Sequence, residues 1–185
     1  MQFSIPKILI AALGLSNVIN ALLTPAQIVV NIRTITVKSQ NLQVTAKSIT
    51  VLDGVLFVVG GGQIPKVITG FGDIVAATTA SIAQMQGTPR VTAAADVKAI
   101  ADAFRVFVQV HQALLNILIG KSGLFRTVPL IGQPVALVLS QIERVVDIIA
   151  YSLIDITEGT ATDILDQTQS LDVTIINAMD AYDGL

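Results

Sequence analysis

Cysteine is absent from this sequence and histidine occurs once in 185 residues. Without cysteine there are no disulfides, no thiolate metal ligands and no cysteine nucleophile. A single histidine, His111, leaves little material for a metal centre or for histidine-based catalysis. Neither G-x-S-x-G nor H-E-x-x-H occurs in the chain. We therefore expect a protein that is not an enzyme and that carries no metal and no cofactor.

Charged residues are also scarce, at 13% of the chain, whereas 52% of the residues are hydrophobic. This balance is typical of one domain with a large buried core. Uninterrupted apolar runs are nevertheless missing, because polar residues such as Arg105, Gln109, Glu143 and Arg144 divide the most apolar windows. A membrane span needs roughly 18 continuous apolar residues. The sequence therefore predicts no transmembrane span.

Charge is unevenly distributed along the chain. Residues 22–126 hold 9 bases and 4 acids, whereas residues 127–185 hold 1 base and 9 acids. Nucleic-acid-binding proteins usually present a strongly basic face, so the overall balance argues against nucleic acid as a partner. The uneven distribution instead predicts that a basic N-terminal helix lies against an acidic C-terminal helix.

The first 21 residues have the order of a secretory signal peptide. Lys7 precedes an apolar run from Ile8 to Leu15, and Ile19-Asn20-Ala21 offers small residues for cleavage. We expect residues 1–21 to be removed, so that residues 22–185 form one extracellular domain.

Apolar residues recur at intervals of three and four through most of residues 22–185, which predicts an all-α protein. The organising stretch is Val110–Thr157, in which two apolar arms flank Gly120, Gly123 and Pro134 and suggest a helical hairpin. We expect a single antiparallel bundle of about five helices. Their expected ranges are from Thr24 to before Gly60, Pro65 to Gln86, from Thr92 to Gly120 or Gly123, from Pro134 to about Thr157, and from Gly159 to Tyr182.

The first of these helices carries a seam of Ile28, Ile32, Ile35, Leu42, Ile49, Leu52 and Leu56, with Ser39 and Ala46 at small positions. Small residues that face one another either draw helices together or leave a space between them. Together with the few aromatic residues of the chain, they leave open whether the interior is filled or hollow.

Some of the apolar positions are candidates for lining a lipid cavity, since aromatic and methionine side chains make adaptable apolar walls. The alternative is that they are ordinary core. The candidate residues are Ile68, Phe71, Ile74, Phe104, Phe107, Val108, His111, Leu114, Leu139, Ile142, Val146, Ile175 and Met179.

His111 is the one ambiguous polar residue, because it lies on the apolar seam between Phe107 and Leu114. We favour a core-edge histidine that is hydrogen-bonded to the backbone or to a side chain of another helix. The alternative is a donor that meets the carboxylate of a bound fatty acid at a pocket mouth. Glu143 and Asp147 stand one turn apart, and we expect them to lie on a solvated face instead of serving as an acid–base pair.

The chain resembles the secreted fungal proteins of the hydrophobic surface binding protein A family, which includes antigenic cell-wall galactomannoproteins. The resemblance rests on VHQALLNILIGKSGLF at Val110–Phe125, on Pro134, on IERVVD at Ile142–Asp147 and on a last helix that closes with Tyr182. These are patterns of apolar spacing, and they extend over nearly the whole of residues 22–185.

The resemblance implies an extracellular or wall-associated helical bundle that adsorbs to hydrophobic surfaces or holds a fatty acid between its helices. It also implies two alternatives, which are a structural or antigenic protein of the cell wall and an adaptor that recruits a secreted hydrolase to a hydrophobic surface. The chain ends Asp183-Gly184-Leu185, without a Ser/Thr-rich stalk or an apolar tail. We therefore expect no lipid anchor.

Overall fold

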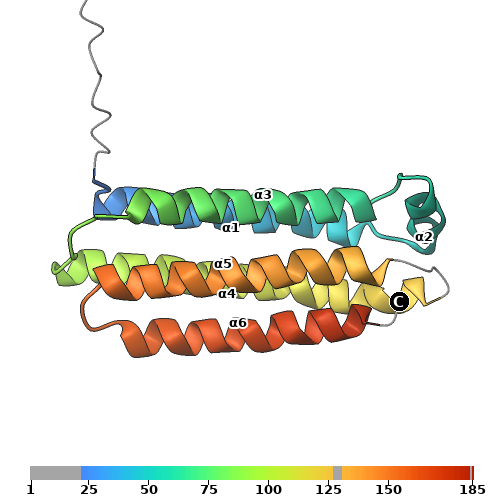
Figure 1. The fold of residues 1–185 in the computed structure, drawn as a ribbon. Helices are drawn as coiled ribbons and strands as arrows, with labels where there is room; N and C mark the ends of the chain where they lie inside the picture. The colour runs from blue at the N-terminus through green and yellow to red at the C-terminus, as the bar shows by residue number, and fades with distance from the viewer. Residues whose placement is uncertain (1–21, 127–130, 184) are drawn as a thin grey trace, which may run out of the picture.

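The computed structural model describes residues 22–126, 131–183 and 185, so the expected signal peptide lies outside the described residues. The regular structure of these residues is helical, and their single isolated bridge joins Val91 to Thr157. The elements are α1 (Pro25–Lys47), α2 (Val51–Val58), α3 (Ile64–Met85), α4 (Ala94–Ser122), a 3₁₀ turn η1 (Gly123–Phe125), α5 (Gly132–Ile156) and α6 (Ala161–Tyr182) (Figure 1). The all-α prediction is confirmed, with six α-helices in place of about five.

The five long helices form a closed ring in the order α1, α4, α6, α5, α3. Consecutive long helices alternate in direction, so α1, α4 and α6 run one way while α3 and α5 run the other (Figure 1). The α4–α6 contact is parallel, since Arg105 meets Asp163 and Gln112 meets Ser170 at the same sequence offset of 58. Long helices that follow one another in the sequence are therefore antiparallel, as predicted. Three of the contacts in the ring, α1·α4, α4·α6 and α3·α5, nevertheless join parallel helices.

This order corrects two expectations. The arms of the predicted hairpin, α4 and α5, do not lie side by side, because α6 packs between them. Likewise α4 separates the basic α1 from the acidic α6, so charge attraction between α1 and α6 does not explain the uneven charge. Opposite charges meet instead between α4 and α6, where Arg105 binds Asp163 at 2.7 Å.

Helix α1 begins where the sequence predicts. Thr24 Oγ1 accepts a hydrogen bond from the backbone N–H of Gln27 at 3.3 Å, and Gln27 Oε1 accepts one from the N–H of Thr24 at 2.8 Å. Pro25 occupies the first turn, where its missing N–H costs no hydrogen bond. This reciprocal cap fixes the start of the helix.

The predicted first helix is in fact two helices, because the chain leaves α1 at Ser48 and starts α2 after Thr50. Ser48 Oγ donates to the carbonyl of Thr45 at 2.8 Å, and Asp53 accepts the backbone N–H of Thr50 at 2.7 Å. These contacts satisfy groups that a continuous helix would have paired. The expectation that Leu52 continues the buried seam is wrong, since 71% of its surface is exposed, and Leu56 is exposed as well.

The glycines at 60–62 form an ordered turn between α2 and α3. Gly60 and Gly62 have φ of 77° and 82°, a left-handed conformation that glycine adopts without strain. A Cβ atom at Gly62 would lie 2.9 Å from Asp53 Oδ1, so a side chain there would displace the carboxylate. The prediction that the helix ends at Gly120 is wrong, because α4 continues through it. The alternative end at Gly123 is right, because α4 ends at Ser122 and Gly123 begins η1.

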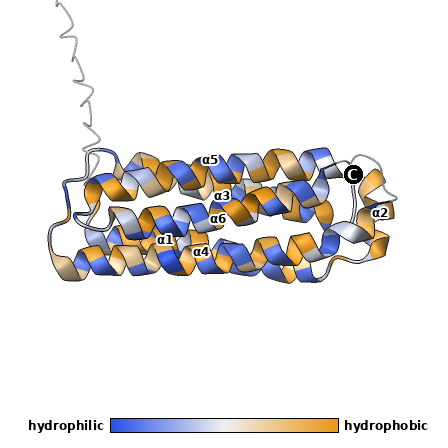
Figure 2. Cartoon of the chain, turned by 90° about the horizontal axis from the view of Figure 1, so that it is seen from below, coloured by the Kyte–Doolittle hydropathy of each residue, from blue (hydrophilic) through white to orange (hydrophobic). Residues whose placement is uncertain are grey.

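The interior of the ring holds the hydrophobic core, to which all five long helices contribute. Figure 2 shows apolar and polar residues alternating around each long helix, with apolar colour dominating α2. At the usual spacing of about 9 Å between helix axes, a regular ring of five places each axis about 8 Å from the centre, against about 6 Å in a ring of four. Such a ring needs more side-chain volume at its centre than a four-helix bundle does.

By length and composition, α4 together with η1 could cross a membrane. In the described structure this segment packs against α1 and α6, and it supplies buried residues to the common core. Core helices pass the same test, so the finding is weak evidence for a span.

Candidate functional site

His111 lies inside the ring, with none of its surface exposed. Its Nδ1 atom is 2.9 Å from Ser39 Oγ of α1. Its other ring nitrogen, Nε2, is buried without a hydrogen-bond partner among the described residues. The preferred sequence interpretation is therefore right in part: the histidine bonds a side chain of another helix, but it lies fully within the core and uses only one of its two nitrogens.

Two phenylalanines enclose the imidazole. The Phe71 ring of α3 meets it edge-on at a centroid distance of 5.9 Å, and the Phe107 ring, one turn before it on α4, lies at 5.4 Å. Because α1 stands between α3 and α4 in the ring, Phe71 reaches His111 across the interior. Phe104 extends this aromatic wall, at 6.0 Å from Phe107. We call Ser39, Phe71, Phe107 and His111 the histidine layer.

The histidine layer keeps its imidazole neutral. Burial lowers the pKa of His111 from 6.5 to about 4, since no water stabilises the charged form. Ser39 Oγ is also within 3.3 Å of the carbonyl of Ile35. If the hydroxyl donates to that carbonyl, Nδ1–H donates to Ser39 and Nε2 is a bare acceptor; if it donates to Nδ1, Nε2–H is an unused donor. In both tautomers the unused group lies at Nε2.

The structure brings most of the predicted cavity residues into one buried cluster. Ile68 and Met179 are exceptions, since both are partly exposed and pack at its edge. The buried residues come from α3, α4, α5 and α6 and are Phe71, Ile74, Phe104, Phe107, Val108, His111, Leu114, Leu139, Ile142, Val146 and Ile175.

The larger hollows of the described surface are lined by other residues. One of about 500 Å³ lies between α4 and the start of α6, beside Arg105 and Asp163. Another of about 740 Å³ lies between the start of α1 and the end of α3. None of the thirteen predicted residues lines these two hollows, so the predicted cavity is not either of them.

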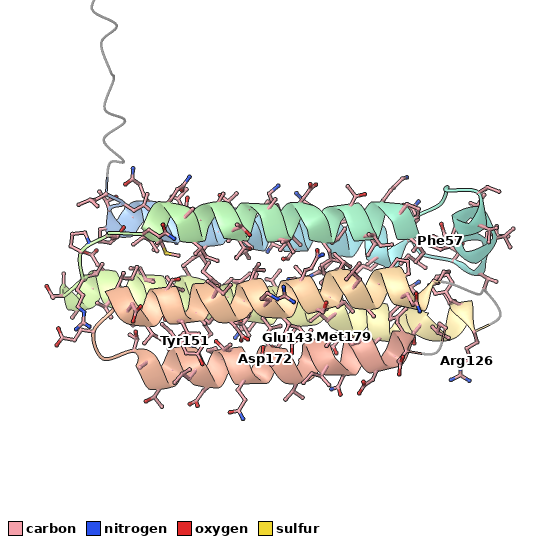
Figure 3. The ribbon with its side chains drawn as sticks, in the orientation of Figure 1. Phe57, Arg126, Glu143, Tyr151, Asp172 and Met179 are labelled. Carbon is pink, nitrogen blue, oxygen red and sulfur yellow. The ribbon has the colours of Figure 1, made fainter. Side chains whose placement is uncertain are left out.

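A second polar cluster lies between α5 and α6. Burial raises the pKa of Asp172 to about 6, and the neighbouring charges of Asp147 and Glu143 act in the same direction. Asp172 Oδ1 has no partner among the described residues. Figure 3 shows Glu143 and Asp172 at this interface. The expectation that Glu143 and Asp147 lie on a solvated face is wrong, because both are half-buried, as is Asp172.

Two contacts of the fold and site are not indicated by the apolar pattern of the sequence. That pattern marks Ser39 as a space-filling residue, because nothing local links positions that are 72 residues apart. It also gives Asp53 no role in joining helices, whereas the carboxylate of Asp53 joins α2 to α3. The spacing Thr50-x-x-Asp53 before an apolar run is a helix-start signal that could have located this junction.

Comparison with known proteins identifies a fold. No family model matches the chain, and no curated protein matches it. Among solved structures, AfMP4p in complex with palmitic acid has a TM-score of 0.75 at 18% identity, over 86% of this chain and 100% of that one. Ligand-binding domain 1 of the Penicillium marneffei MP1 protein, complexed with arachidonic acids, has a TM-score of 0.68 at 13% identity, over 85% and 95%.

Domain 2 of the same MP1 protein, complexed with multiple arachidonic acids, has a TM-score of 0.58 at 14% identity, over 87% of this chain and 96% of that one. At these identities the similarity establishes a shared helical fold. The structural neighbours are fungal proteins that bind fatty acids, and their complexes contain a ligand type that the sequence also suggested for this chain.

Proposed function

We propose that this chain binds a long-chain fatty acid inside its helical ring, with the carboxyl group at His111. The observation that carries the proposal is the unused Nε2 atom of a fully buried histidine. The shared fold of AfMP4p and the MP1 domains, solved with palmitic and arachidonic acids, supports the same ligand class.

An unpartnered polar atom in an apolar core costs free energy, of the order of 1–3 kcal/mol. A carboxyl group at Nε2 removes that cost in either tautomer. A carboxylate accepts a hydrogen bond from Nε2–H, and a protonated carboxylic acid donates one to bare Nε2. A bound carboxylate would also favour the imidazolium, so binding raises the pKa of His111 from its free value of about 4.

The acyl chain supplies most of the binding free energy. Each buried CH₂ contributes up to about 0.8 kcal/mol, which suffices for micromolar binding of a long chain after the costs of association. In the ring the chain would extend from the histidine layer among core residues of α4, α5 and α6. Leu114, Ile142 and Ile175 are candidates for contact with it, because they are buried in that part of the core.

The test is a titration of the purified protein with a fluorescent fatty acid, competed by palmitic acid or by its methyl ester. We expect the acid to compete better than the ester. His111→Leu should bind the acid about tenfold more weakly and bind the ester as the original protein does, because the ester needs no carboxyl partner.

Thr78→Val is the matched control. Thr78 is a buried polar residue of α3, but its hydroxyl donates to the carbonyl of Ile74 in its own helix. The variant should therefore bind the acid and the ester as the original protein does. A protein that binds neither competitor contradicts the ligand class. A His111→Leu variant that keeps the full preference for the acid contradicts the carboxyl position alone.

We further propose that the chain acts outside the cell and adsorbs to hydrophobic surfaces, as the family resemblance implies. Large apolar side chains on the outside of the long helices favour adsorption, among them Val44 at 70% exposure and Leu137 and Tyr151 at 62%. Depletion of the protein from solution by hydrophobic beads at moderate salt tests it. A protein that stays in solution contradicts adsorption and, with it, recruitment of a hydrolase to such surfaces.

A further inference from the structure

Helix α2 has the usual pattern of burial reversed. Its two fully buried residues are Asp53 and Gly54, whereas most of its large apolar side chains face outward. The exposed fractions are 61% for Val51, 71% for Leu52, 69% for Val55, 45% for Leu56, 71% for Val58 and, just after the helix, 79% for Val59. We call these six residues the apolar tip. Helix α2, which carries most of them, lies at one end of the ring beyond α1 and α3 (Figure 1).

The reversal is built into the fold. Asp53 accepts hydrogen bonds from the backbone N–H of Thr50 at 2.7 Å, the hydroxyl of Thr50 at 2.9 Å and the backbone N–H of Gln63 at 2.7 Å. Phe57, half-buried, packs against the core on the same side. Because these contacts hold the inner side of α2, the apolar tip cannot turn inward without breaking them.

Four basic residues lie at the same end of the bundle as the apolar tip. Lys47 ends α1 just before it, and Lys66 lies in the first turn of α3, close enough to Asp53 to act on its charge. Lys121 donates to the carbonyl of Ile49 at 2.7 Å, immediately before α2. Arg126 follows η1, which packs against α2, and Figure 3 shows it pointing outward at this end.

Fewer acidic residues than basic ones lie at this end of the described structure. The ion pairs of the described residues join Lys98, Arg105, Asp102 and Asp163 at the opposite end. Asp53 is occupied by its three hydrogen bonds. The exposed Asp180 and Asp183, at the end of α6, lie at the same end of the bundle as α2, although α6 does not pack against α2 (Figure 1). The four bases outnumber the three acids Asp53, Asp180 and Asp183, so the surroundings of the apolar tip carry a small excess of positive charge.

We propose that the apolar tip docks the closed ring onto an anionic lipid bilayer. Exposed valine and leucine side chains enter the boundary between headgroups and acyl chains, and the flanking bases meet the anionic headgroups. A second copy of the chain is the less suitable occupant, because joining two such tips would bring their basic surroundings together. The proposal goes beyond fatty-acid binding, since it needs no ligand inside the ring.

Flotation with vesicles of phosphatidylcholine, with and without phosphatidylserine, tests this docking. We expect the protein to float with the anionic vesicles and to stay behind with the neutral ones. Leu52→Ser with Val55→Ser should lower the vesicle affinity at least tenfold. Lys66→Gln should lower it about fivefold, the factor that corresponds to roughly 1 kcal/mol per base near an anionic surface.

Val30→Ser with Val106→Ser is the matched control. These valines are also exposed, at 57% and 49%, but lie outside the tip on α1 and α4, so this variant should float as the original protein does. Because the chain lacks tryptophan, Val58→Trp adds a single reporter whose emission should shift to the blue on anionic vesicles. All variants should keep their fatty-acid affinity, which separates this proposal from the preceding one.

Three results would overturn the docking proposal. The first is an original protein that floats with neither vesicle type, and the second is a double-serine variant that floats like the original. The third is a dimer in solution that the double-serine variant abolishes without any vesicle binding, which would assign the apolar tip to self-association.

Discussion

Asp53 and His111 are both buried polar groups in a chain that is mostly apolar, yet their surroundings differ in kind. Asp53 accepts three hydrogen bonds from two residues, and these bonds join the start of α2 to the start of α3. His111 makes one hydrogen bond, to Ser39, and its second nitrogen has no partner among the described residues. The first group is complete within the fold, whereas the second has capacity left for a ligand.

The two regions also differ in what their polar group does to the apolar residues nearby. Asp53 holds α2 by its polar side and so leaves valines and leucines in contact with solvent. His111 is itself surrounded by aromatic rings. Since a satisfied polar group stabilises the fold and an unsatisfied one costs stability, substitutions at the two positions should have opposite consequences.

The largest effect on the free energy of unfolding should come from lowering the pH. The pKa of His111 is about 4 in the folded chain and 6.5 when exposed, so below pH 6.5 the unfolded chain takes up a proton that the folded chain refuses. Stability is therefore lost as pH falls from 6.5 towards 4, by roughly 3 kcal/mol in total. His111→Leu should remove this loss. Urea unfolding of both proteins at neutral and acidic pH measures it, and parallel pH curves would contradict the buried neutral histidine.

The next largest effect on stability should come from Asp53, the buried group at the junction of α2 and α3. Asp53→Ala removes an acceptor from three donors and should lower the free energy of unfolding by about 2 kcal/mol. Hydrogen exchange should show loss of protection at the amides of Thr50 and Gln63. Asp73→Ala, at an exposed carboxylate of α3, is the control and should change little. Unaltered exchange in the Asp53 variant would mean that the junction does not depend on the carboxylate.

A smaller effect of opposite sign is expected at Asp172. Its folded pKa of about 6 lies above the ordinary 3.8, so its ionised form costs stability above pH 6 and this cost disappears as pH falls towards 4. Asp172→Asn should therefore stabilise the protein at pH 7, by about 1 kcal/mol or less after allowance for its partial exposure. Asp166→Asn, on the exposed side of the same helix, is the control. A gain that persists at pH 4 would point to another cause.

The smallest effect should come from the apolar tip. Leu52→Gln should change the free energy of unfolding by less than about 0.5 kcal/mol, because 71% of the leucine is already exposed. Thermal unfolding of this variant beside the original protein measures the change. A loss comparable to that of Asp53→Ala would show that the tip is packed in solution, and the contrast between the two regions would fail.

The sequence predicts where the helices lie along the chain better than it predicts which helices pack against one another. Apolar spacing located the five long helices, and Thr24 with Pro25 located the first start, because these signals are local. The ring order is not local, since it depends on which stripes match across the interior, and no spacing in the chain indicates that α6 separates α4 from α5. The break at Ser48–Thr50 was missed because the apolar spacing continues through it to Leu52 and Leu56.

The candidate site shows the same division. The apolar spacing placed His111 and its phenylalanines on inward-facing stripes, but the partner of the histidine is 72 residues away on another helix. A single sequence gives no means of pairing Ser39 with His111. It also gives no means of recognising that one nitrogen would remain unused, which is the observation on which the proposed function rests.

Helix α6 completes the ring of long helices, because it packs between α4 and α5. Without α6, the helices α1, α3, α4 and α5 would form an open arrangement, with a slit between α4 and α5 along the length of the bundle. The 22 residues of α6 close that slit, because α6 packs against both α4 and α5. On that side of the ring α6 alone separates the imidazole of His111 from solvent, so detachment of α6 would expose the histidine layer without unfolding the other four long helices.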